Sequence, residues 1–150
     1  MVIMHPPYAN FLTYSEKPED LSKPIPTFLP MFEDVMKNVL QYLDDGRMLV
    51  LVIGDMYEDS ELKPLGFECM KIVLNHNCRL KAIIVKDFGK YNRQMREGDG
   101  LLTYRALTGG YYRFAHEYVM VFQKMPHTMK FLDMLGVDMK SDREIEEWFT

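Results

Sequence analysis

The sequence predicts an α/β fold, a partial doubly wound, Rossmann-like sheet of about four strands with flanking helices. Four apolar segments have the length of strands: residues 1–4, 48–53, 80–85 and 118–122. Amphipathic helical patterns separate the first three, an order typical of parallel strands joined by helices. No helical pattern precedes the fourth segment, so we expect it to lie antiparallel beside the third.

The composition is typical of one domain with a single core. The chain has 150 residues, of which 47% are hydrophobic and 27% are charged. No apolar run approaches the roughly 20 residues that span a bilayer, and the start lacks a signal-peptide pattern, so we expect a cytoplasmic location without membrane contact. The net charge of −4 argues against a chain that binds polyanions over its whole surface. Two cysteines, Cys69 and Cys78, are too few for a disulfide framework, and we expect buried free thiols.

The first strand is short and stops abruptly. Residues 1–4 are apolar and predict a buried strand, which Pro6 and Pro7 end because proline cannot donate a ladder hydrogen bond. Two adjacent prolines make a rigid corner with free carbonyl groups, at the strand end where open α/β sheets place ligands. Tyr8 follows and could lie flat on a planar ligand such as a base.

The next elements form a βαβ unit with that strand. Residues 11–25 are polar and rich in proline, which indicates a loop. Residues 27–45 predict the clearest helix, with one apolar stripe and Gly46 as its C-terminal cap. Residues 48–53 follow at once and are apolar throughout, so we expect a strand buried on both faces that closes with Gly54 and Asp55.

The second half of the chain repeats this alternation and then departs from it. Residues 60–75 predict a helix with Pro64 in its first turn, and residues 80–85 predict a third buried strand. After the fourth strand, helical patterns at 129–135 and from Ser141 onward suggest a helical tail. We therefore divide the chain into a unit of residues 1–124 and a C-terminal helical tail of residues 125–150.

The loop between the third and fourth strands is basic and aromatic. Between Lys90 and Arg113 five basic residues face two acidic ones, a local charge of +3. Basic side chains interleaved with aromatic ones suit a surface that follows a nucleic-acid backbone and stacks on bases. A solvated hairpin loop without a specific partner is the alternative. The candidate DNA-binding residues are Lys90, Arg93, Arg96, Arg105, Tyr111 and Arg113.

The corner after the first strand resembles the catalytic motif of the amino-directed DNA methyltransferases, a polar residue followed by Pro-Pro-Tyr or Pro-Pro-Phe. It reads His5-Pro6-Pro7-Tyr8 here. In that family the polar side chain and a proline carbonyl accept hydrogen bonds from the amino group of a flipped-out adenine or cytosine, and the aromatic ring stacks on the base. The resemblance implies that these four residues are catalytic and that the amino nitrogen attacks the methyl group of S-adenosylmethionine directly.

Two further segments are similar to the same family. The strand of residues 48–53 ends in Gly54-Asp55, and an aromatic-glycine segment leads into His116-Glu117-Tyr118 at the start of the last strand. Asp55 could line the cleft or simply cap the strand. Adjacent strand residues point to opposite faces, so we interpret His116 as packing or capping at the strand entrance rather than as a partner of Glu117.

The resemblance extends to the catalytic half only. Family enzymes bind S-adenosylmethionine with a glycine-rich turn between a strand and a helix, and this sequence has no such turn. Permuted members carry the catalytic half first, and this chain looks like that half. We therefore expect DNA as a partner, doubtful cofactor binding by this chain alone, and a homodimer or a partner that carries the cofactor-binding half.

Other functions stay open at this point. A non-catalytic DNA-binding or regulatory subunit of a methyltransferase would keep the same corner and the same basic loop. A docking protein could use Pro-Pro-Tyr as a ligand for another domain. The four histidines lack the spacing of metal ligands, so no metal is expected: His5, His76, His116 and His127.

Overall fold

The computed structural model describes residues 1–11, 13–59, 61–87, 108–109 and 116–126. Its elements are β1 (Val2–Met4), the 3₁₀ turn η1 (Ala9–Phe11), α1 (Ile25–Tyr42), β2 (Met48–Ile53), β3 (Met56–Glu58), β4 (Glu61–Lys63), α2 (Leu65–Asn75), β5 (Cys78–Asp87) and β6 (His116–Lys124). In this part of the chain, no helix has the length and hydropathy to cross a membrane. The predicted tail helices at 129–135 and from Ser141 lie outside the described residues.

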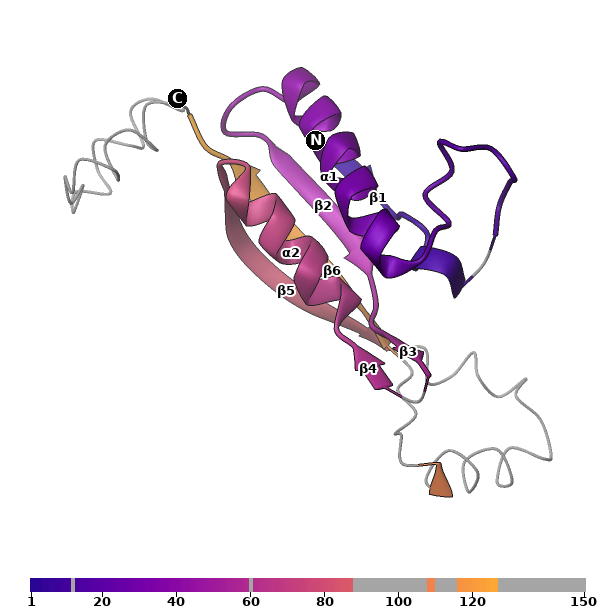
Figure 1. Ribbon diagram of the computed structural model, residues 1–150. Helices are drawn as coiled ribbons and strands as arrows, with labels where there is room; N and C mark the ends of the chain where they lie inside the picture. The colour runs from indigo at the N-terminus through magenta and orange to yellow at the C-terminus, as the bar shows by residue number, and fades with distance from the viewer. Residues whose placement is uncertain (12, 60, 88–107, 110–115, 127–150) are drawn as a thin grey trace.

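The main sheet has four strands in the order β1-β2-β6-β5 (Figure 1). β1 runs parallel to β2, and β6 runs antiparallel to both β2 and β5. The predicted partial sheet with an antiparallel last strand is therefore confirmed. The sequence did not predict that β6 separates β2 from β5, because a pattern of single strands does not tell which neighbours they choose.

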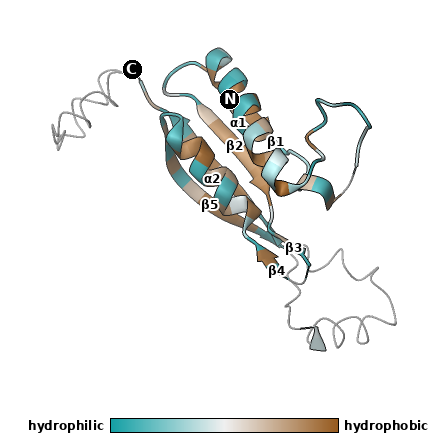
Figure 2. Cartoon of the chain, in the orientation of Figure 1, coloured by the Kyte–Doolittle hydropathy of each residue, from teal (hydrophilic) through white to brown (hydrophobic). Residues whose placement is uncertain are grey.

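Both helices cover the same face of this sheet. α1 buries the stripe Phe28, Phe32, Met36 and Leu40, and α2 buries Leu65, Cys69 and Val73. The sheet contributes Leu49, Leu51, Ile53, Met120 and Phe122 to the same core. Figure 2 shows hydrophobic residues along β2 and hydrophilic ones on the outward side of α1. Full burial of each large apolar side chain contributes about 1.5–3 kcal/mol. The contacts between the two helices and this face of the sheet therefore contribute much of the stability of the fold.

The other face of the sheet is apolar and no described helix covers it. Strand residues alternate between faces, and those opposite the core include Val50, Val52, Val119 and Val121, all half-buried. Ile3 and Ile84 lie on the same side and are 64% and 53% exposed. The prediction that residues 48–53 are buried on both faces was therefore wrong for the described part of the chain, and so were the buried strands predicted at residues 1–4 and 80–85. β1 and β5 are edge strands, and β2 is fully buried only on its helix side.

Two predicted helix boundaries also differ. Residues 61–63 belong to a β3–β4 hairpin that turns at Asp59, which has a φ of 53°, so α2 starts after Pro64 rather than at Ser60. Gly46 is not the cap of α1, which ends at Tyr42. Gly46 has a φ of 78° in the turn before β2, where its N–H donates to the carbonyl of Lys124. Cys69 and Cys78 are buried free thiols, as predicted.

Candidate functional site

A pocket of about 380 Å³ lies at the corner that follows β1. Its lining consists of His5, Pro6, Pro7, Tyr8, Phe11, Tyr14, Lys86 and Glu117. The mutually parallel strands β1, β2 and β5 all end on this side of the sheet, and β6 begins there. The pocket thus occupies the carboxyl end of the parallel strands, where open α/β sheets bind their ligands. The predicted corner His5-Pro6-Pro7-Tyr8 forms one wall of it.

The backbone of the corner is held in an uncommon conformation. Ala9 has a φ of 45° and is fully buried, and the N–H of Phe11 donates to the carbonyl of Tyr8 at 3.0 Å. A left-handed conformation costs a residue with a Cβ roughly 1–2 kcal/mol. The strain at Ala9 occurs where the chain turns sharply and places Tyr8 in the pocket wall. Strained backbone of this kind is common at functional sites.

Glu117 joins three elements inside this pocket. Its side chain is 4% exposed. The hydroxyl of Tyr8 donates to Oε2 at 2.6 Å, and Nζ of Lys86 donates to Oε1 at 2.6 Å. Nε2 of His5 lies 3.7 Å from Oε2, within ion-pair distance if that ring is protonated. The corner after β1, the end of β5 and the start of β6 therefore converge on one carboxylate.

The surroundings of this carboxylate favour its ionised form. Burial is the largest influence and opposes ionisation, but hydrogen bonds from Lys86 and Tyr8 and the nearby positive charges outweigh it, so the pKa of Glu117 is below its ordinary value. Burial, followed by the bond to Glu117, raises the pKa of the Tyr8 hydroxyl far above its ordinary value. Tyr8 is therefore a neutral hydrogen-bond donor, and Glu117 is its charged acceptor.

Gly54 leaves the space through which Tyr8 reaches β6. A Cβ at Gly54 would lie 3.4 Å from Cε2 of Tyr8 and 3.6 Å from the carbonyl oxygen of His116. A methyl group would just make contact there, and any larger side chain would meet the ring. The predicted Gly54-Asp55 strand end thus contributes to the site through its lack of a side chain.

Asp55 has a structural role on the helix side of the sheet. The N–H of Gly66, in the first turn of α2, donates to Oδ1 at 3.0 Å, and the hydroxyl of Tyr118 donates to Oδ2 at 3.1 Å. A carboxylate is favourable at a helix N-terminus because of the helix dipole. His116 packs edge-on against Tyr118, with ring centroids 5.3 Å apart. Asp55 and His116 therefore stabilise the scaffold and do not line the pocket.

Aromatic rings surround the mouth of the pocket. The rings of His5 and Tyr8 lie 6.0 Å apart at 56°, and Phe11 and Tyr14 are 68% and 71% exposed. Exposed aromatic side chains beside a charged cluster can take a planar ligand between or upon them. The pocket thus combines flat apolar surfaces with carbonyl and imidazole groups that can accept hydrogen bonds.

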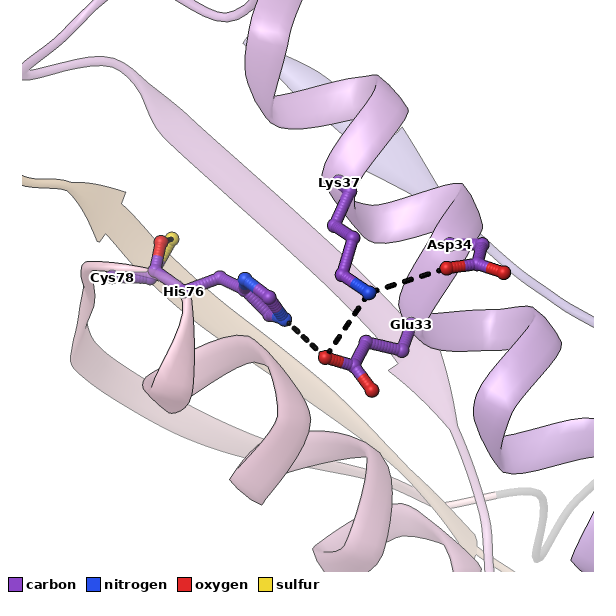
Figure 3. A network of polar contacts seen from close by, with 5 residues as sticks. All are labelled: Glu33, Asp34, Lys37, His76 and Cys78. Carbon is purple, nitrogen blue, oxygen red and sulfur yellow. Dashed lines mark hydrogen bonds and ion pairs between the residues drawn. The ribbon is translucent and has the colours of Figure 1, made fainter.

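A second hollow, of about 450 Å³, lies at the opposite end of the sheet, and its cations already have partners. Nζ of Lys124 donates to the carbonyls of Leu40 and Leu43. Figure 3 shows that Glu33 on α1 points toward His76, which follows α2, and that Lys37 points toward Glu33 and Asp34. Nε2 of His76 lies 2.9 Å from Oε1 of Glu33, and this contact joins the two helices. The cluster is a structural clasp, and it offers no unpaired charge to a ligand.

Sequence reasoning found one wall of the pocket and missed the other. Lys86 and Glu117 were not predicted as site residues, although Glu117 is a buried charged residue, which is unusual unless it has a partner. The predicted DNA-binding residues all lie outside the described residues: Lys90, Arg93, Arg96, Arg105, Tyr111 and Arg113. Their assignment stays a prediction.

The described strand ends lack the glycine-rich turn expected of an S-adenosylmethionine site. On the pocket side these ends are the proline corner after β1, Gly54-Asp55 after β2 and the end of β5 at Asp87, and Asp55 already contacts the N-terminus of α2. No glycine-rich turn leads from a strand into a helix in this part of the chain. Groups of three or more metal-ligating side chains are also absent from the described residues.

No family model and no curated protein match the sequence, but solved structures resemble it. The chain is similar to TTHA0409 of Thermus thermophilus, provisionally described as a DNA modification methylase. Its selenomethionine form has a TM-score of 0.55 at 17% identity, over 83% of this chain and 44% of that one. The form complexed with S-adenosyl-L-methionine has a TM-score of 0.53 at 17% identity, over 83% and 47%. This chain spans less than half the length of these neighbours, and the likeness shows that it has a methyltransferase-like fold.

Proposed function

We propose that this chain is the catalytic half of a site-specific DNA methyltransferase that modifies N6 of adenine or N4 of cytosine. The observation that carries the proposal is the pocket in which His5, Pro6 and Tyr8 meet Glu117 at the carboxyl ends of the strands. The methyl donor would be S-adenosylmethionine, which one of the structural neighbours binds. As in permuted enzymes of this type, the catalytic half would precede the cofactor half.

The pocket residues have the chemistry that an amino group requires. A neutral His5 and the carbonyl of Pro6 would each accept a hydrogen bond from the exocyclic amino group, which keeps its nitrogen lone pair available. Pro7 fixes the corner, and Tyr8 would support the face of the base. A base inside a duplex cannot reach such a pocket, so the target would have to be flipped out of the helix.

The basic loop would supply affinity for DNA without sequence information. We propose that Lys90, Arg93, Arg96, Arg105 and Arg113 contact phosphates and that Tyr111 stacks on a base. Each phosphate contact releases counterions, so the affinity should fall steeply as salt is added. Which sequence is recognised would be decided by other parts of the enzyme.

Cofactor binding would come from outside the described residues. We propose that residues 1–124 act as the catalytic half and that residues 125–150 are an appended tail. We further propose that the chain forms a homodimer or binds a partner that carries the cofactor half. The uncovered apolar face and the two edge strands give such a partner a surface to cover. An enzyme that modifies chromosomal DNA would work in the cytoplasm.

Calorimetric titration of S-adenosylmethionine into the purified chain, alone and with single-stranded DNA, tests this division of labour. We expect no heat from the chain alone. A duplex with 2-aminopurine at the target position then tests base binding, because flipping raises its fluorescence. Tyr8→Ala should weaken that signal, since base stacking on an aromatic ring contributes about 1–3 kcal/mol. Equal signals from wild type and Tyr8→Ala would remove Tyr8 from the base site.

A non-catalytic DNA-binding or regulatory subunit is the second candidate. The lack of a glycine-rich cofactor turn among the described residues favours it. The two candidates differ when the partner that carries the cofactor half is added. A catalytic half gains methyl transfer that His5→Ala abolishes, whereas a regulatory subunit changes the partner's activity and tolerates His5→Ala.

A further inference from the structure

We propose that Glu117 is a positioning residue, whose buried carboxylate holds the ring of Tyr8 in the orientation that the pocket presents to a base. This inference rests on the proposed function of the pocket. The inference adds Glu117, from β6, to a site that the sequence predicted only in the N-terminal corner. Glu117 itself would touch neither the base nor the cofactor.

The geometry fixes Tyr8 at both ends. Its backbone sits in the rigid corner, where Pro7 precedes it and the strained Ala9 follows it. Its hydroxyl donates at 2.6 Å to a side chain that is 4% exposed. A ring held at both ends cannot swing about its Cα–Cβ bond without breaking a charge-assisted hydrogen bond in a buried position.

Lys86 makes the carboxylate a dependable anchor. Lys86 and Glu117 are directly opposite in the β5–β6 register, and their side chains meet at 2.6 Å. The cation compensates the buried negative charge, so the carboxylate stays ionised and keeps accepting from Tyr8. Each oxygen of Glu117 therefore accepts one short hydrogen bond, one from Tyr8 in the corner after β1 and one from Lys86 on β5.

The same arrangement argues against Glu117 as a general base. A general base needs a free oxygen that can reach the proton it removes. Both oxygens of Glu117 are already engaged, and the paired Lys86 makes the carboxylate a weaker base. The contribution of Glu117 is therefore to pre-order Tyr8, which lowers the entropic cost when a base stacks on it.

Two substitutions separate the ring from its anchor. Tyr8→Phe keeps the stacking surface, deletes the hydroxyl and leaves the Glu117–Lys86 pair in place. Glu117→Leu removes the anchor, and Glu117→Gln restores an oxygen that can accept from Tyr8. We expect Tyr8→Phe and Glu117→Leu each to weaken binding to a 2-aminopurine duplex about tenfold, as loss of a charged hydrogen bond predicts. The double variant should be no weaker than either single one, and Glu117→Gln should recover most of the affinity.

A measurement on the free protein tests the anchor without DNA. Three-bond Hα–Hβ couplings at position 8 report by NMR whether the side chain occupies one χ1 rotamer. We expect one rotamer in wild type and in Glu117→Gln, and averaged couplings in Glu117→Leu and Tyr8→Phe. Tyr42→Phe is the matched control, because Tyr42 is 89% exposed on α1 and should change neither readout.

The outcomes distinguish the two levels of the proposal. If wild type does not prefer the flipped-base duplex but the couplings behave as expected, the proposed function is wrong and the anchoring of Tyr8 by Glu117 stands. A single rotamer at position 8 in Tyr8→Phe overturns the anchoring, whatever the DNA data show. If Glu117→Leu does not fold, Tyr8→Phe decides the question alone.

Discussion

The hydroxyl of Tyr8 and the carboxylate of Glu117 meet at 2.6 Å, although 109 residues separate them in the sequence. β2 lies between β1, which the Tyr8 corner follows, and β6, which carries Glu117. Tyr8 passes the end of β2 at Gly54, where no side chain blocks the ring. The contact therefore depends on three separate features: the corner after β1, the missing side chain at the end of β2, and the central position of β6. Loss of the corner, a side chain larger than a methyl group at Gly54, or another strand order would separate the two residues.

Glu117 should make the stability of the protein depend on pH. Its pKa is lower in the folded chain than in the unfolded one, so its contribution is present above the ordinary glutamate pKa and is lost as pH falls through the lowered value. Urea unfolding of wild type and Glu117→Gln between about pH 7 and pH 3 measures this. The advantage of wild type should shrink toward acid pH. A constant difference would show that Glu117 gains nothing from its charge.

Gly66 should tolerate no side chain. A Cβ there would lie 2.9 Å from Cδ2 of Tyr118, closer than real Cβ atoms approach, and 3.3 Å from Oδ1 of Asp55, which is also tight. We expect Gly66→Ala to lower the free energy of unfolding by about 1–3 kcal/mol, the usual cost of overpacking. Gly54→Ala is the matched control, because its Cβ would meet only ordinary contacts. Equal losses for the two variants would contradict this packing argument.

The two thiols should be inert in the folded protein. Burial raises the pKa of Cys69 to about 12 and that of Cys78 to about 11, so neither forms the reactive thiolate near neutral pH. An aromatic disulfide that releases a coloured thiolate on reaction with free thiols should therefore react with neither residue at about pH 8 until denaturant is added. Fast labelling of Cys69 in the native protein would mean that α2 separates readily from the sheet.

The clasp between the two helices should be weak and sensitive to salt. The hydrogen bond from His76 is the main influence that lowers the pKa of Glu33, and the Lys37 charge assists it. The stability that this gives is present above the ordinary glutamate pKa and fades as pH falls through the lowered one. A double-mutant cycle with Glu33→Gln and His76→Gln should give a small favourable coupling that high salt removes. A coupling that persists at high salt would point to packing instead.

The uncovered face of the sheet should drive association. Ile3 and Ile84 are exposed on it, and half-buried valines from β2 and β6 continue the surface between them. Sedimentation velocity across a concentration series should show self-association, or binding to the partner when it is present. Ile84→Lys should weaken either one. A monomer at every concentration, together with no effect of Ile84→Lys on partner binding, would contradict the proposed covering of this face.

The sequence predicted the elements well because strands and helices follow local patterns. The stripe of α1 recurs at three- and four-residue steps, β2 is a continuous apolar run, and the proline corner is marked by its own residues. The β3–β4 hairpin was missed because each of its strands has only three residues, too few for a period to show. A proline near a helix start fits both the first turn and the position before it, so Pro64 did not fix the start of α2.

The half of the pocket that was missed depends on pairing between distant segments. The predicted pairing of β6 with β5 left the register open, and the register places Lys86 opposite Glu117. Nothing local to either residue shows that β6 also lies next to β2, which brings Glu117 within reach of Tyr8. The burial of β1 and β5 was overestimated for a related reason. Apolar runs show which strands can be buried, but the number of covering helices decides which of them are.

The central position of β6 also has a consequence for biosynthesis. Met48 in β2 pairs with Gln123, and Cys78 in β5 pairs with Lys124. Neither strand can complete its pairing until this late segment of the chain has been synthesised. On the ribosome, β2 and β5 emerge long before residues 116–124 and expose unpaired, apolar strand edges in the meantime. A chain interrupted before residue 116 would therefore be a substrate for chaperones or proteases rather than a smaller folded protein.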